Sequence, residues 1–359
     1  MLLNSVIIFA WVIKPIIGYI IDNFLNKKTW IFIALVLDII TVLILGLAPL
    51  PVFTLVTFLL INSANTAFRD VSVDGIMCVE GKKYNSTGKI QSVQWISISI
   101  AGLLTGILGG YIAQRAGYRL GFLCLVPVYL LVGITAYFYK EGKSADEGYP
   151  ARYLFRDLKK LLADKRLIII GLFIFLYKYS PSFGTPLFFI QRDSFKWGKI
   201  WIGTLATIST FFQIGGALFY YKFSQKINPV RNTTQREANI KVSNGVNLKK
   251  WLLISVFLGA LTTLSYLYYT PVTAVVYDVL YSFIGMFIFI MVLDFMARST
   301  VKGLEATSFA LLTSISNLAL VTSNVSGAFL LPLIGLKWLI VFSALTSFLC
   351  LPLINKINE

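Results

Sequence analysis

Residues 68–95 read FRDVSVDGIMCVEGKKYNSTGKIQSVQW and lie between two long apolar runs. The stretch holds three acidic and four basic side chains: Arg69, Asp70, Asp74, Glu80, Lys82, Lys83 and Lys89. Moving an ionisable side chain into lipid costs roughly 2.5–3.5 kcal/mol on insertion scales. We therefore expect these side chains to lie at a membrane surface or to line a water-filled cavity.

The composition is that of a polytopic membrane protein. Of the 359 residues, 57% are hydrophobic and 13% are charged, and the mean hydropathy is +0.76. Soluble domains carry about 25% charged residues. The apolar runs reach the about 20 residues that a spanning helix needs and lack the alternation of barrel strands. The sequence therefore predicts an all-α integral membrane protein in a lipid bilayer.

The net charge of +16 would suggest nucleic acid as a partner for a soluble protein. Here most of the basic residues lie in short loops, which is typical of the positive-inside rule, so no nucleic-acid partner is expected. The chain has no histidine, so any proton coupling would use Asp or Glu. The three cysteines are far apart and show no metal-ligand spacing. No cofactor or metal is expected.

Eleven spans in two bundles are predicted. An N-terminal bundle, residues 1–140, contains five spans, at about 2–21, 30–48, 52–77, 91–112 and 120–139. A C-terminal bundle, residues 167–359, contains six, at about 167–190, 200–223, 251–269, 272–296, 305–331 and 336–354. The sixth span should be kinked at Pro181 and Pro186. Basic residues concentrate in alternate loops, which predicts an N-terminus outside and a C-terminus in the cytosol.

Residues 141–166 form the predicted cytosolic linker between the bundles. Within it, residues 151–166, ARYLFRDLKKLLADKR, place their apolar side chains on one helix face. This pattern indicates an amphipathic helix on the membrane surface, with a solvated linker helix as an equal alternative.

A repeated glycine spacing suggests two homologous halves. Gly109 and Gly117 end the fourth span, and Gly327 and Gly335 end the tenth at the same spacing. Parallel repeats on either side of a long loop are typical of two-half transporters.

Two lysines fall near the middle of the membrane, one in each half. At about 1.5 Å per residue, Lys14 lies about 12 Å from the end of its span and Lys178 roughly 16 Å into its own. Such residues are functional candidates, and a pair of them in a central cavity would attract an anion. The alternative is neutralisation by a carboxylate, and Asp38 and Asp278 lie at comparable depths.

Four blocks of sequence carry a family resemblance: Lys14-Pro15-x-x-Gly18-x-x-x-Asp22; DVSVDG at 70–75 with Glu80; Gln91-Ser92-x-x-Trp95; and KGLEATSFALLTSISN at 302–317. Together they resemble the folate–biopterin transporter family, which is related to the major facilitator superfamily. The resemblance runs through nearly the whole chain. It implies two six-helix bundles around a central cavity, with the first of the usual twelve helices missing here.

The resemblance also implies substrates and roles for particular residues. The family carries folates and pterins, so Lys14 and Lys178 would bind carboxylates, while Trp95 and Tyr177 would stack on a ring or face lipid. Asn317 would hydrogen-bond a pterin edge or a neighbouring helix. Five acidic residues are expected to act as gate ion pairs or proton sites: Asp22, Asp70, Asp74, Glu80 and Glu305. Family members occur in plasma membranes and plastid envelopes.

Three functions compete. The first is secondary transport of folate- or pterin-type anions by alternating access, coupled to protons. The second is a truncated family member that does not transport. The third is an intramembrane transferase, because Asp70-x-x-x-Asp74 resembles an aspartate-rich motif. Position 66 is Thr where such a motif needs Asn, and no second motif follows. We therefore expect a protein that is not an enzyme.

Overall fold

A computed structural model describes residues 13–141, 161, 163–227 and 244–356. Every regular element in these ranges is helical. The elements before the linker are α2 (Lys14–Asn23), α3 (Lys27–Leu47), α4 (Val52–Lys83), α5 (Thr87–Leu123) and α6 (Leu125–Phe138). The amphipathic helix predicted over 151–166 falls largely outside the described residues.

The elements after the linker include several short helical turns. They are α8 (Lys165–Lys178), α9 (Gly184–Phe189), the π-helical turn η2 (Ile190–Ser194), α10 (Lys199–Ile227), α11 (Asn244–Ser265), the 3₁₀ turn η4 (Tyr266–Tyr268), α12 (Pro271–Arg298), α13 (Glu305–Thr346), the 3₁₀ turn η5 (Ser347–Cys350) and α14 (Leu351–Ile354).

The fold is that of an integral, multi-pass membrane protein. In the described part of the chain, seven helical stretches are long and apolar enough to cross a membrane: Lys27–Leu47, Val52–Lys83, Arg115–Phe138, Ile200–Ser224, Lys249–Tyr268, Pro271–Arg298 and Glu305–Ile354. The last of these contains two of the predicted spans. The count of eleven therefore stays a prediction.

Two glycines divide the two longest helices at equivalent points. Gly117 in α5 has φ 75° and ψ 172°, and Gly335 in α13 has φ 72° and ψ 167°. This backbone region is open essentially to glycine alone. Each long helix is therefore two helices joined at a sharp turn, and the turns fall between the predicted fourth and fifth and the predicted tenth and eleventh spans.

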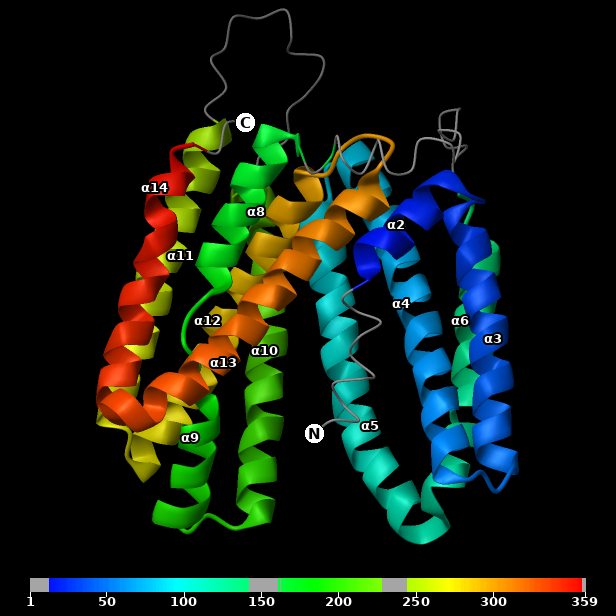
Figure 1. The fold of residues 1–359 in the computed structure, drawn as a ribbon, viewed down its shortest axis with the longest axis horizontal. Helices are drawn as coiled ribbons and strands as arrows, with labels where there is room; N and C mark the ends of the chain where they lie inside the picture. Colours follow the sequence, from blue (N-terminus) through cyan, green and yellow to red (C-terminus); the bar gives the residue numbers. More distant parts are fainter. Residues whose placement is uncertain (1–12, 142–160, 162, 228–243, 357–359) are drawn as a thin grey trace, which may run out of the picture. The chain divides into compact units, whose positions relative to one another are not determined.

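The chain folds into two compact units. Unit 1 comprises Met1–Tyr84, Ala101–Leu161 and Met296–Ser314; unit 2 comprises Asn85–Ile100, Leu162–Phe295 and Ile315–Glu359. In unit 1, α3 packs along α4 and α6, and α2 packs on α4 (Figure 1). In unit 2, α8 and α11 both pack against η5 and α14 (Figure 1). The predicted division at 1–140, 141–166 and 167–359 stays a prediction.

Candidate binding cavity at the break in α8

The sixth predicted span is interrupted rather than kinked. Helix α8 ends at Lys178, the next five residues are not helical, and α9 begins at Gly184. Pro181 lies inside this break. Proline has no N–H and disfavours helical geometry at the residue before it, here Ser180. Pro186, the other predicted kink, lies within the first turn of α9, where a missing N–H is tolerated.

Two serines of α13 form hydrogen bonds with this unwound segment. Ser180 N donates to Ser323 Oγ at 3.0 Å, and Ser182 N donates to the Ser323 carbonyl at 2.9 Å. The Ser180 hydroxyl donates to the Ser343 carbonyl at 3.2 Å and also contacts the Ser343 hydroxyl. Because buried backbone groups need partners, these bonds allow the helix to stay open beside Lys178.

Gly327 lets α13 approach the unwound segment closely. A Cβ atom at Gly327 would lie 2.1 Å from the Ser182 carbonyl oxygen. That is far inside van der Waals contact, and the opposing atom is backbone that cannot rotate away. The glycine of the repeated spacing is therefore needed for packing at this point.

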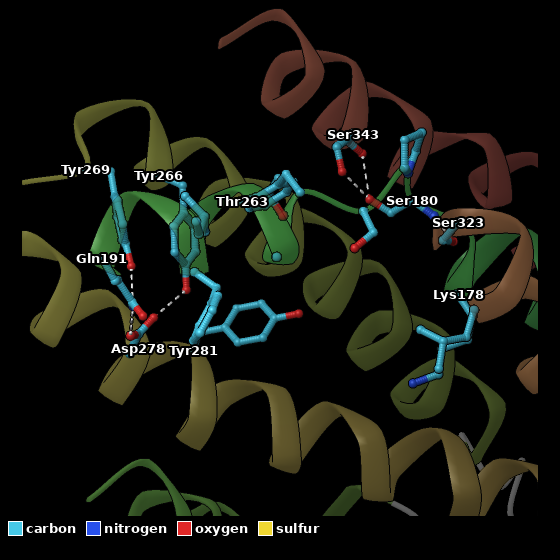
Figure 2. A pocket seen from close by; sticks show the side chains of 17 residues that line it. Lys178, Ser180, Gln191, Thr263, Tyr266, Tyr269, Asp278, Tyr281, Ser323 and Ser343 are labelled. Atoms are coloured by element: carbon cyan, nitrogen blue, oxygen red, sulfur yellow. Dashed lines mark hydrogen bonds between the residues drawn. The ribbon is translucent and has the colours of Figure 1, made fainter. Parts of the chain in front are cut away.

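The break opens into a cavity of about 430 Å³ that lies wholly within unit 2. This volume falls in the range of small-molecule sites, about 300–1,000 Å³. Polar side chains and aromatic rings mix in its lining (Figure 2). The lining includes Lys178, Phe183, Gln191, Tyr266, Asp278 and Tyr281.

A second cavity of about 200 Å³ adjoins the first and shares Lys178, Ser180, Thr263 and Tyr281 with it. Tyr177 lines only this second cavity, where its hydroxyl hydrogen-bonds that of Ser255 at 2.6 Å. Of the predicted binding residues, Lys178 and Tyr177 thus lie beside cavities of the same unit.

Lys178 has no carboxylate within ion-pair distance among the residues that the structure describes. Its ammonium group lies 4.6 Å from the centre of the Phe289 ring, a cation–π contact. Trp95 packs edge-on against the same ring, with centroids 4.6 Å apart. Trp95 therefore supports Phe289 and is not part of the cavity lining.

Asp278 and its partners line the other end of the larger cavity, as Figure 2 shows. Its carboxylate accepts hydrogen bonds from Tyr266 Oη and Gln191 Nε2, both at 3.3 Å. Gln191 Nε2 also donates to Tyr269 Oη at 2.7 Å. The position of Asp278 inside an apolar run indicated from sequence that it could be functional. The sequence gives no indication that Gln191 would hydrogen-bond to it.

In unit 1, the other predicted midplane lysine is paired. Lys14 Nζ lies 2.5 Å from Asp70 Oδ2, with side chains 7% and 31% exposed. Asp38, the carboxylate expected near that depth, pairs instead with Arg69. Arg69 also stacks over the ring of Tyr129. The structure thus brings Lys14 and Asp70 together and separates Lys14 from Asp38.

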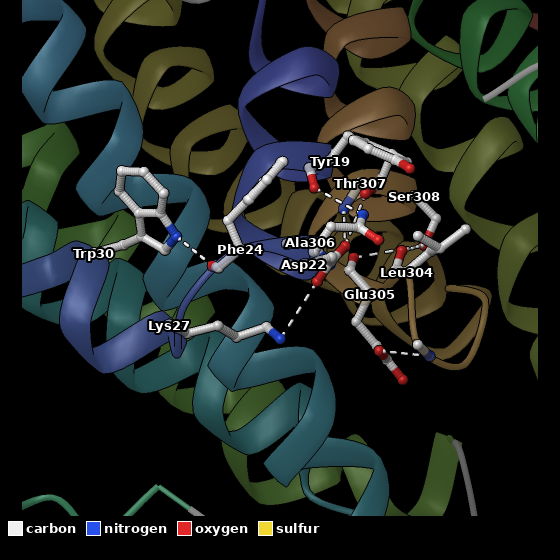
Figure 3. A network of polar contacts seen from close by, with 12 residues as sticks. Tyr19, Asp22, Phe24, Lys27, Trp30, Leu304, Glu305, Ala306, Thr307 and Ser308 are labelled. Atoms are coloured by element: carbon white, nitrogen blue, oxygen red, sulfur yellow. Dashed lines mark hydrogen bonds and ion pairs between the residues drawn. The ribbon is translucent and has the colours of Figure 1, made fainter. Parts of the chain in front are cut away.

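Asp22 caps the N-terminus of α13 (Figure 3). Its carboxylate accepts from Thr307 N and Thr307 Oγ1, both at 2.8 Å, and from Ala306 N at 3.3 Å. Lys27 Nζ lies 3.3 Å away. A negative charge here satisfies free N–H groups and interacts favourably with the helix dipole.

The other predicted gate residues also lie in unit 1. Glu305, the first residue of α13, pairs with Lys82 at 3.2 Å, and Glu80 accepts from Tyr139 Oη at 3.2 Å. Asp74 is buried on α4.

In unit 2, the predicted binding residue Asn317 is exposed and lines neither cavity, so the structure does not bring it to the site.

One buried acidic group in unit 2 was missed as a candidate. Asp294 is fully buried and accepts hydrogen bonds from Thr87 Oγ1 and, at 2.8 Å, from Tyr220 Oη. A Cβ atom at Gly88 would lie 2.9 Å from this carboxylate. The Asp294 carboxylate, on α12, thus links the start of α5 to α10 through hydrogen bonds.

Solved structures of transporters share this fold. The human organic anion transporter MFSD10 matches with a TM-score of 0.70 at 14% identity, over 98% of this chain and 82% of its own. The proton:xylose symporter XylE, of the major facilitator superfamily, matches with a TM-score of 0.67 at 12% identity, over 99% and 86%. These likenesses show a transporter fold of the major facilitator type.

The sequence comparison gives the family. The model of the BT1 family matches residues 1–359, and the chain belongs to this family, that of the folate–biopterin transporters. The "Folate-biopterin transporter" of Synechocystis is 22% identical over 96% of this chain and 72% of its own length. "Probable folate-biopterin transporter 2" of Arabidopsis thaliana is 23% identical over 92% and 67%. The chain is therefore a membrane transporter and not an enzyme.

Proposed function

We propose that this protein carries folate- or pterin-type organic anions across a membrane by alternating access, together with protons. Lys178 carries the proposal: it is the last residue of α8 within the predicted sixth span, lines both cavities of unit 2 and lacks an ion-pair partner among the described residues. Burying an ammonium group without a counter-ion is costly, and an anionic ligand would supply one.

The break in α8 supports the same assignment. In many transporters the substrate site lies where a membrane helix is discontinuous and its backbone lines a cavity. Here the break begins directly after Lys178, and serines of α13 hold it open. We propose Lys178 and Tyr177 as binding residues and Trp95 as support for Phe289. Lys14 and Asn317 are proposed only as secondary contacts, since Lys14 is paired and Asn317 is exposed.

We propose gating and proton coupling for five acidic residues of unit 1: Asp22, Asp70, Asp74, Glu80 and Glu305. Asp22, Asp70 and Glu305 form ion pairs with lysines. An ion pair that opens on protonation would link helix movement to a proton gradient. From the positive-inside pattern we propose that the C-terminus lies in the cytosol, and we propose a plasma membrane or a plastid envelope as the membrane.

Uptake of tritiated folate into proteoliposomes tests the proposal. We expect wild-type protein to accumulate folate above protein-free vesicles, with faster uptake when an inward proton gradient is imposed. Lys178→Ala should abolish most uptake. Lys165→Ala, at the exposed first residue of the same helix, is the matched control and should leave it unchanged. No uptake of folate, biopterin or methotrexate by wild type would reject a carrier of pteridines and favour a non-transporting family member.

A further inference from the structure

Four acidic residues of unit 1 form ion pairs, whereas the two charged residues that line the larger cavity of unit 2 form none with the residues that the structure describes. In unit 1, Asp22, Asp38, Asp70 and Glu305 each form an ion pair with a lysine or arginine. In unit 2, Arg192 and Asp193 form an exposed ion pair. Lys178 and Asp278 line one cavity, yet they form no ion pair with each other or with any other residue that the structure describes.

The two charges lie at opposite ends of the group of lining residues, as Figure 2 shows. The cavity is therefore polarised, with a cation at one end and a carboxylate at the other. The hydrogen bonds to Asp278 are both 3.3 Å long, which is longer than normal hydrogen bonds and therefore weak, and each of its oxygens can accept further bonds.

Between these ends the lining is aromatic. The rings of Phe183, Tyr266 and Tyr281 line the cavity. Figure 2 shows Tyr281 between Asp278 and Lys178. Aromatic rings of this kind bind flat heterocycles by stacking or edge contacts.

We infer that the cavity binds its ligand in one orientation, with an anionic group at Lys178 and the amino edge of a flat heterocycle at Asp278. This inference rests on the proposed function and adds a specificity residue to it. The 2-amino-4-oxo edge of a pterin presents two neighbouring N–H donors. A carboxylate can accept both, as it does from a guanidinium group. Gln191 and Tyr269 hold Asp278 at the position where that edge would lie.

Two fragments of folate separate the two ends. Pterin has the heterocycle and no carboxylate, whereas p-aminobenzoylglutamate has two carboxylates and no pteridine. Binding of each fragment and of folate would be measured by calorimetry on purified full-length protein in nanodiscs. The variants are Asp278→Asn, Lys178→Met and the control Asp193→Asn, which removes an exposed carboxylate of the same unit.

The inference predicts a crossed pattern. Asp278→Asn should weaken pterin by about ten-fold or more, the loss of a hydrogen bond to a charged group, and change p-aminobenzoylglutamate by less than about two-fold. Lys178→Met should do the reverse, and Asp193→Asn should change neither. Folate should weaken in both single variants.

Other outcomes overturn the inference. Unchanged pterin binding in Asp278→Asn, with folate still bound by wild type, would remove Asp278 from recognition and leave the proposed function standing. Equal weakening of both fragments, together with a lower melting temperature, would make Asp278 a structural residue. Failure of wild type to bind folate or either fragment would reject the proposed function itself.

Discussion

Lys14 and Asp70 form the shortest lysine–carboxylate pair in the described residues, with 2.5 Å between Nζ and Oδ2. The preceding residue of α4, Arg69, pairs with α3 instead. Consecutive helical residues point about 100° apart, so one turn of α4 can reach two neighbouring helices. Unit 1 thus uses its buried charges to join α2, α3 and α4.

Because Lys14 is paired with Asp70, replacing Lys14 should lower the stability of the protein. Lys14→Met should destabilise the protein by about 1–3 kcal/mol, between the values for exposed and for buried pairs, because Asp70 keeps its charge without a partner. Adding Asp70→Asn should recover most of that loss. Thermal unfolding of both single variants and the double variant measures the coupling. Additive losses would show that the two side chains do not interact in the protein.

The turns at Gly117 and Gly335 predict similar losses of stability when either glycine is replaced. Gly117→Ala and Gly335→Ala should each destabilise by about 1–3 kcal/mol, because their backbone angles are strained for any other residue. Gly102→Ala serves as the control, since it lies in helical α5 with no atom within 4 Å of its added Cβ. Equal stability of all three variants in unfolding experiments would contradict the claim that the two turns require glycine.

Gly327 and Gly109 occupy equivalent places in the repeat, but only Gly327 contacts backbone. Gly327→Ala should force α13 away from Ser182, loosen the open segment after Lys178 and lower both folate binding and melting temperature. Gly109→Ala, with nothing within 4 Å, should change neither. A tolerated Gly327→Ala would mean that the break in α8 does not depend on this contact.

The cap on α13 predicts a difference between two substitutions of Asp22. Asp22→Ala leaves the N–H groups of Ala306 and Thr307 unsatisfied and should cost about 0.5–2 kcal/mol. Asp22→Asn keeps an acceptor oxygen and loses only the charge, so it should cost less. Chemical denaturation of the two variants would show the order. Equal losses in the two variants would mean that the charge, through its pair with Lys27, outweighs the cap.

Much of this fold could be predicted from hydropathy and glycine spacing. The helix beginning at Val52, the turns after the predicted fourth and tenth spans and the family were all readable from the chain. The break in α8 was expected only as a kink, because Pro181 alone does not reveal that Ser323 accepts from the freed backbone and that Ser343 accepts from the Ser180 hydroxyl. These serines lie more than 140 residues away in sequence.

The candidate site was only partly predictable for the same reason. A lysine inside an apolar span is visible in the sequence as a candidate, and Lys178 was predicted in this way. Whether a lysine is already paired depends on helix packing, which brought Asp70 to Lys14 and left Lys178 beside Phe289. Asn317 shows the converse, since its place in a block that resembles the family did not bring it to either of the two cavities described.

The dissociation constant of folate for purified protein, compared between Lys178→Met and the control Lys165→Met, is the decisive measurement. Loss of the ammonium group that binds the anion should weaken folate by about ten-fold or more, while the exposed lysine of the same helix should leave affinity within about two-fold of wild type. Equal affinity in all three proteins would contradict the role assigned to Lys178.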